Sequence, residues 1–162
     1  MFSAITTSAL LIAAAQAKLK VLSPPSLASQ FKEGVITASY ANFGFIPYGQ
    51  TIMGKIHYDV NDSEACEEFS LDDKNELERS ADITPFYIAK RGGCSFVQKV
   101  RNMENIGVAV GIVVDDKAEY IQNILMSDDG TGGGIRIPSM LISKPDGEVL
   151  LEWLANASPS EK

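Results

Sequence analysis

The chain has 162 residues, of which 45% are hydrophobic and 22% charged, and this is enough for one domain with a sizeable core. Its formal net charge of −7 argues against a nucleic-acid or anionic-membrane surface, since phosphates require clustered Lys and Arg side chains. The charge weakly favours cationic partners, although a solvated acidic surface is the simpler explanation.

Residues 1–17 predict a cleaved secretory signal peptide. An apolar run from Ala9 to Ala15 ends in Ala15-Gln16-Ala17, which is a small-x-small cleavage pattern. The run is shorter than the roughly 20 residues that span a bilayer, and no later segment is long and apolar enough, so we expect no membrane span in this chain. The alternative for this segment is a disordered or buried N-terminal helix. We therefore expect one domain over residues 18–157, followed by a frayed tail over 158–162.

Short strands are predicted in the first third of the chain, over residues 19–22, 34–40 and 51–60. The last of these alternates apolar and polar residues, so one of its faces is expected to be wet. The acidic segment 62–82 is expected to form a long loop with one helical turn.

Cys66 and Cys94 are the two cysteines of the chain, and in an oxidising lumen they would form a disulfide. Two free buried thiols are the alternative. The Asn-x-Ser triplets at Asn61 and Asn156 are candidate N-glycosylation sites that point to the same compartment.

A strand, a helix and a second strand are predicted between residues 84 and 114. Residues 84–89 and 108–114 are apolar runs typical of buried strands. Between them, Ser95 and Gln98 match a capping box, and apolar residues follow at helical spacing until Gly107. Such a unit implies a right-handed crossover between parallel strands.

The remaining elements follow in order. Residues 115–127 are expected to contain a short helix, 128–134 a flexible loop and 137–142 a strand. A terminal helix over 147–155 is expected to open with Ser143 and Pro145. The fold class is therefore α/β.

The sequence offers little support for catalysis or for a bound metal or cofactor. The one histidine, His57, lies within a predicted strand, and no serine occupies a nucleophile elbow. The loop from Asp128 lacks the ligands of an EF-hand and the Lys-Ser/Thr of a phosphate-binding loop. We expect no enzyme activity, no cofactor and no metal.

Arg91-Gly92-Gly93 is the best candidate binding site. It follows a predicted parallel strand, where ligands of open α/β sheets usually bind, and it precedes the positive N-terminus of a helix. The arginine and the glycine amides could hold a carboxylate or a peptide carbonyl, with Asp128 and Asp129 in a neighbouring loop. The alternative is a solvated arginine, or one paired with a nearby aspartate.

The chain resembles the protease-associated (PA) domain, especially the lumenal PA domain of vacuolar sorting receptors. The resemblance covers residues 19–155 and is carried in order by Asn42-Phe43-Gly44 with Tyr48-Gly49, Ala65-Cys66, Arg91-Gly92-Gly93-Cys94-Ser95-Phe96, Gly111-Ile112-Val113-Val114-Asp115-Asp116, and Ile137-Pro138-Ser139 with Leu141-Ile142. It implies a β-sandwich-like or mixed-sheet α/β domain with flanking helices and a Cys66–Cys94 bridge.

In those receptors the turn that matches residues 91–93 binds the backbone of cargo sorting peptides, a role that falls here on Arg91. The receptor turn ends in an aspartate where this chain has Gly93, and the receptors' further modules do not occur in this sequence. We expect a non-catalytic peptide- or protein-binding domain of the secretory pathway, in a vacuolar, endosomal or extracellular compartment. The alternative is a structural subunit that holds a fixed partner in a larger assembly.

Overall fold

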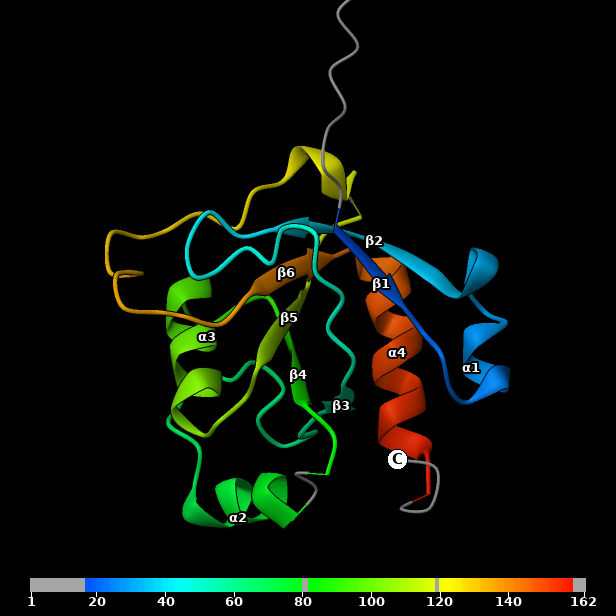
Figure 1. Ribbon diagram of the computed structural model, residues 1–162, viewed down its shortest axis with the longest axis horizontal. Coiled ribbons are helices and arrows are strands. Elements are labelled where there is room, and N and C mark those ends of the chain that lie inside the picture. Colours follow the sequence, from blue (N-terminus) through cyan, green and yellow to red (C-terminus); the bar gives the residue numbers. More distant parts are fainter. Residues whose placement is uncertain (1–16, 80–81, 119, 159–162) are drawn as a thin grey trace, which may run out of the picture.

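A six-stranded mixed sheet forms the centre of the structure, a computed structural model that describes residues 17–79, 82–118 and 120–158. The strands lie in the order β1-β2-β6-β5-β4-β3, and the sheet curls along that order (Figure 1). β3, β4, β5 and β6 run parallel to one another, whereas β1 and β2 pair antiparallel. The strand bounds are β1 Ala17–Lys20, β2 Val35–Tyr40, β3 Lys55–His57, β4 Pro85–Lys90, β5 Val110–Val114 and β6 Ser139–Ile142.

Helices cover both faces of the sheet. α1 (Pro25–Ala28) and α4 (Lys144–Asn156) pack on one face, and α2 (Leu71–Arg79) and α3 (Phe96–Asn105) lie on the other (Figure 1). Two short 3₁₀ turns, Lys32–Gly34 and Ile121–Asn123, complete the regular structure of the described residues. The result is a three-layer arrangement that buries both faces of the central strands.

The β4-α3-β5 unit explains how this arrangement is built from the sequence. All five residues of β5 are buried, as expected for a strand between two helical layers. Ser95 caps α3 by accepting a hydrogen bond from the Gln98 amide at 3.2 Å, and Gly107 ends the turn after α3 with φ +96°. The Gln98 side chain does not complete the predicted capping box; its Nε2 donates to Asn102 Oδ1 at 3.1 Å.

Close helix-to-sheet packing requires a glycine in α4. A Cβ added to Gly147 would overlap the Val114 side chain, so glycine lets α4 lie directly on β5. Leu150, Leu151 and Leu154 then join the core of that face. Each fully buried leucine contributes roughly 2 kcal/mol of transfer free energy.

Three predicted elements were wrong in extent or type. The strand expected over residues 51–60 is restricted to Lys55–His57, because the preceding residues run as an irregular segment. The expected loop over 62–82 contains the nine-residue helix α2 rather than one turn. The helix expected within 115–127 is only the 3₁₀ turn Ile121–Asn123. By contrast, Ser143 caps α4 as predicted, and α4 spans Lys144–Asn156.

The α/β class, the mixed sheet, the βαβ unit and the flanking helices are confirmed. The predicted signal peptide lies outside the described residues except for Ala17, which is the first residue of β1, and most of the predicted tail lies outside them as well. The proposed domain limits stay predictions. Among the described residues, no helix has the length and apolar character needed to cross a membrane.

Candidate functional site

The Arg91 turn lies at the carboxyl edge of the parallel strands. Arg91 follows β4 directly and donates its backbone N–H to Val114 O at 2.8 Å, while Asp115 follows β5 and donates to Ile142 O at 3.0 Å. Gly92 and Gly93 have φ angles of +125° and +65°, and Cys94 N donates to Gly92 O at 2.7 Å. Both positive φ angles favour glycine, and the angle of Gly92 lies outside the left-handed region that Asp and Asn also adopt, so the turn depends most on Gly92.

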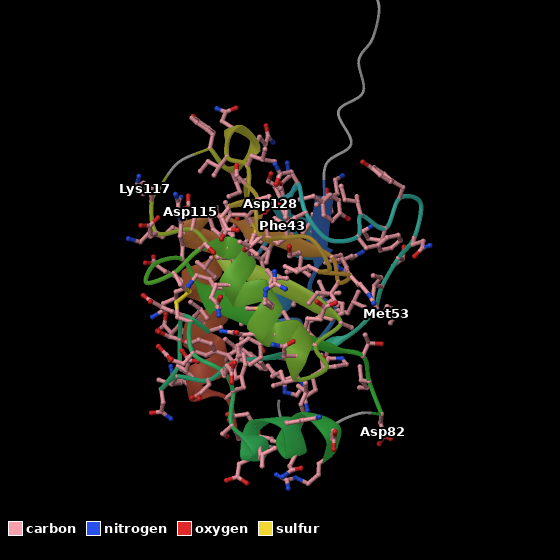
Figure 2. The ribbon with its side chains drawn as sticks, turned by 90° about the vertical axis from the view of Figure 1, so that its left-hand side faces the viewer. Phe43, Met53, Asp82, Asp115, Lys117 and Asp128 are labelled. Carbon is pink, nitrogen blue, oxygen red and sulfur yellow. A yellow bond between two sulfur atoms is a disulfide. The ribbon has the colours of Figure 1, made fainter. Side chains whose placement is uncertain are left out.

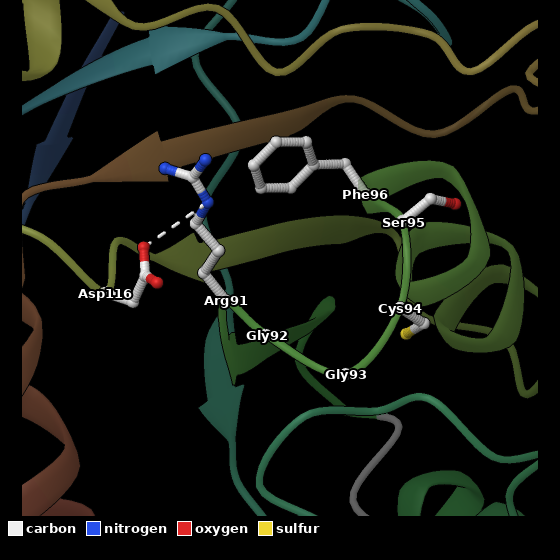
Figure 3. A pocket seen from close by; sticks show the side chains of 7 residues that line it. All are labelled: Arg91, Gly92, Gly93, Cys94, Ser95, Phe96 and Asp116. Carbon is white, nitrogen blue, oxygen red and sulfur yellow. Dashed lines mark ion pairs between the residues drawn. The ribbon is translucent and has the colours of Figure 1, made fainter.

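The Arg91 side chain is held by two aspartates at the end of β5. Its Nη1 lies 2.7 Å from Asp115 Oδ1. Its Nε lies 3.4 Å from Asp116 Oδ1, the pair drawn in Figure 3. The guanidinium also covers the Phe96 ring at 5.3 Å from the ring centroid, a cation–π geometry. The Asp115 side chain is fully buried and that of Arg91 is 30% exposed. The ion-paired arginine, which the sequence left open as an alternative, is therefore present.

A shallow groove opens beside this turn, with a volume of about 370 Å³. It is lined by Arg91, Gly92, Gly93, Cys94, Ser95, Phe96 and Asp116 (Figure 3). Backbone without side chains, the N-terminus of α3, a guanidinium and an aromatic ring thus meet in one place. Such a surface offers donors to a carbonyl oxygen and an apolar wall to a side chain.

The two predicted loop aspartates have different positions. Asp128 accepts hydrogen bonds from Gly130 N and Gly132 N, both at 2.8 Å, so its carboxylate stabilises its own loop and does not line the groove. Asp129 reaches the rim of the groove, where hydrogen bonds from Ser95 and Thr131 lower the pKa of Asp129 to about 2. Figure 2 shows the Asp115 and Asp128 positions.

A buried lysine beneath the turn was missed by the sequence reasoning. Lys99 on α3 is 0% exposed, and its Nζ donates to Gly92 O at 2.6 Å and to Glu64 O at 2.7 Å. Burial lowers the pKa of Lys99, an effect that the charge of Glu64 partly opposes. Lys99 lies at helical spacing from Met103 and Ile106, so the sequence could have indicated that it is buried, although not which groups it contacts.

Segment 64–67 is anchored to α3 next to that lysine. Asn102 Nδ2 donates to Ala65 O at 3.1 Å and to Glu67 O at 2.9 Å, and the predicted Cys66–Cys94 disulfide is present. The turn and this segment are therefore joined by one covalent and several polar contacts. Asn61 and Asn156 are both exposed, and their glycosylation stays a prediction.

His57 lies away from the Arg91 groove. It faces a second hollow of about 630 Å³ between β3 and α2, whose lining includes Asp73, Glu76 and Tyr87. Burial and the nearby Lys55 lower the pKa of His57, and Glu76 opposes the shift. Among the described residues, no group of three or more His, Cys, Asp or Glu side chains is placed to hold a metal ion.

The sequence profile of the PA domain matches residues 52–150. The chain belongs to the PA-domain family. The match includes the Arg91 turn, Cys66, both strands of the βαβ unit and the loop aspartates.

Relatives of this PA domain include plant receptors. Vacuolar-sorting receptor 2 of Arabidopsis thaliana is 29% identical over 146 residues, which cover 87% of this chain and 23% of the receptor. Receptor homology region, transmembrane domain- and RING domain-containing protein 2 of the same organism is 34% identical over 114 residues, which cover 70% of this chain and 24% of that protein. The chain thus spans about a quarter of the length of these curated relatives.

A solved structure with the same fold is a zinc aminopeptidase from Bacillus subtilis. It aligns with a TM-score of 0.58 and 16% identity, covering 85% of this PA domain and 28% of the aminopeptidase. At this identity the likeness shows the fold alone.

Proposed function

We propose that this PA domain is a non-catalytic peptide-binding domain, and that it holds an extended peptide segment at the Arg91 groove. The observation that carries the proposal is the groove itself, in which the bare Gly92-Gly93 backbone lies between the Arg91 guanidinium and the start of α3. One relative is named a vacuolar-sorting receptor and another is named for a receptor homology region, and these names support a binding role over a catalytic one.

The groove suits a peptide backbone because its polar groups are already positioned. The two ion pairs and the Phe96 contact restrict the Arg91 side chain, so binding would order few additional rotamers. The groove residues with reactive side chains serve structural roles: Cys94 is in a disulfide, and Ser95 caps α3. His57, which could act as a general base, lines the other hollow.

The compartment belongs to the same proposal. The Cys66–Cys94 disulfide is typical of an oxidising compartment, and several relatives are named vacuolar-sorting receptors. We place the domain in the lumen of the secretory pathway, vacuolar or endosomal, or outside the cell.

Selection from a phage-displayed library of random dodecapeptides on the immobilised chain tests the proposal. We expect enriched peptides whose affinity, measured by calorimetry, falls at least tenfold in Arg91→Ala and stays unchanged in Arg136→Ala. Arg136 is exposed and lies outside the groove lining, so it serves as the matched control.

A second readout does not depend on a substituted turn. In the wild-type chain, the enriched peptide should shift the amide resonances of Gly92, Gly93 and Ser95 in an NMR titration. Peptides that bind equally well to Arg91→Ala, or that shift resonances elsewhere only, would refute a site at this turn.

The alternative function, a structural subunit that holds a fixed partner, has one supporting observation. The segment between β2 and β3 exposes apolar side chains, among which Tyr48 is 74% and Met53 66% exposed. Purification of the chain in a stoichiometric assembly that dissociates on Tyr48→Ser and Met53→Ser substitution would favour this alternative.

A further inference from the structure

We propose that Glu64 is a specificity-determining residue of the Arg91 groove and that it makes the groove select peptide segments with a positive charge. This inference rests on the proposed peptide-binding function. It names a residue from a different segment of the chain and the charge class of the ligand.

Glu64 occupies the space that side chains of the turn would otherwise fill. A Cβ added to Gly93 would overlap Glu64 Oε2, and one added to Gly92 would lie 2.8 Å from Glu64 Oε1. The carboxylate therefore lies against the two glycines of the turn, and both glycines line the groove. Glu64 is not itself among the residues that line the groove, but at these two positions the turn has no side chain between its carboxylate and the groove.

The position of Glu64 is determined by the fold. Its carbonyl oxygen accepts the 2.7 Å hydrogen bond from Lys99, and the next two residues are held by Asn102 and by the disulfide. Ala65 is fully buried with φ +53°, and on the other side Ser63 O accepts a hydrogen bond from Lys90 N at 2.7 Å, so the backbone is restricted on both sides of Glu64.

The Glu64 carboxylate remains available to a ligand. Within the described part of the chain, no side-chain cation lies within 4 Å of it, and no backbone N–H or hydroxyl group donates a hydrogen bond to it. The residue is partly exposed. A carboxylate in this state can pair with an incoming cation without first losing a partner.

The charges around the groove favour a cation as well. Arg91 is already matched by Asp115 and Asp116, and the Lys99 ammonium is directed to carbonyl oxygens beneath the turn. The charge of Glu64, which the Lys99 ammonium partly offsets, and that of Asp129, which is hydrogen-bonded to Ser95, then add negative charge next to the groove. A Lys or Arg side chain or a free amino terminus would complement this field, whereas a ligand carboxylate would be repelled.

The test uses two fluorescent pools of random hexapeptides, acetylated and amidated at their ends, that differ by Lys or norleucine at one central position. Fluorescence anisotropy at low salt should give a several-fold tighter binding of the Lys pool to the wild-type chain. We expect Glu64→Gln to reduce this preference at least threefold, whereas Glu68→Gln leaves it unchanged. Glu68 is an exposed carboxylate of the same segment and is the matched control.

Moving the carboxylate from Glu64 to another residue tests whether its place beside the turn determines the preference. Asp tolerates the φ of +65° at Gly93, and once Glu64 is shortened the nearest neighbour of the new Cβ is Cys66 Sγ at 3.0 Å, a tight contact. The double variant Glu64→Ala with Gly93→Asp therefore returns a carboxylate close to the original one and should recover the preference for the Lys pool. Thermal unfolding confirms that each variant is folded.

The outcomes separate the two proposals. Binding that depends on Arg91 but shows the same Lys preference in Glu64→Gln overturns the role of Glu64. If neither pool binds, or if Arg91→Ala does not weaken the binding, the peptide-binding function is overturned. The role of Glu64 is then overturned with it.

Discussion

Lys99 shows how a single buried residue maintains the geometry of the groove. Its ammonium donates to the carbonyl oxygens of Gly92 and Glu64, which belong to segments far apart in sequence. Replacement by Met would keep most of the side-chain volume but leave both carbonyls without this donor. Since each unsatisfied buried polar group costs about 1–3 kcal/mol, and removal of a buried charge offsets part of this, we expect Lys99→Met to lose about 2 kcal/mol of unfolding free energy.

Urea denaturation of the oxidised chain measures that loss. Lys74→Met is the control, because Lys74 is exposed on α2 and the same substitution there should change the unfolding free energy by less than about 0.5 kcal/mol. Equal stability of Lys99→Met and the wild type would show that the two hydrogen bonds do not stabilise the fold.

At this scale the sequence predicted only part of the site. Arg91, Gly92 and Gly93 are consecutive, so their strand-end position could be inferred from local patterns, and they do line one groove. Glu64 and Lys99 reach the turn from other segments, across 28 and 7 residues from Gly92, and no local pattern encodes such contacts. Asp115 and Asp116, the partners of Arg91, stand next to each other in the sequence. The sequence does not show, however, which of the chain's several carboxylates lie within 4 Å of the Arg91 guanidinium.

Strand β3 places a titratable group in a partly apolar setting at the edge of the sheet. His57 Nε2 is buried and has no hydrogen-bond partner among the described residues. The pKa of His57 is lowered in the folded chain. On acidification, His57 therefore takes up its proton near pH 6.5 in the unfolded chain but only at a lower pH in the folded chain. The unfolded state then binds more protons, and stability must fall as the pH drops below about 6.5.

The prediction is that His57→Gln removes this component of the pH dependence. The difference in unfolding free energy between wild type and variant should be constant above about pH 7 and should move in favour of the variant below pH 6.5, by at most about 1.4 kcal/mol per pH unit. Carboxylates titrate in both proteins and cancel in this difference. A difference that stays constant from pH 8 to pH 5 would contradict the lowered pKa.

Among the elements, those with strong periodicity and a clear cap were predicted well. α3 has both features and β5 is a continuous apolar run, whereas α2 was assigned to a loop because its sequence is acidic and polar. A signal was present even there, since Ser70 and Asp73 form a reciprocal cap at the start of α2, with Ser70 N and Asp73 Oδ2 2.8 Å apart. β3 is short because only three residues pair with β4, a limit set by tertiary contacts rather than by alternation.

For the molecule as a whole, the Cys66–Cys94 disulfide joins the segment before α2 to the turn before α3, and its sequence separation is 28 residues. Closing a loop of this size stabilises the folded state by about 3 kcal/mol, chiefly by restricting the unfolded chain.

We expect the double variant Cys66→Ser with Cys94→Ser to fold, because both faces of the sheet retain their cores, but to melt about 10 °C lower than the oxidised wild type. Differential scanning calorimetry with and without dithiothreitol measures this shift. The reductant should lower the melting temperature of the wild type toward that of the variant and leave the variant unchanged. Should the variant melt with the oxidised protein, Lys99 and Asn102 alone would suffice to hold the turn against segment 64–67.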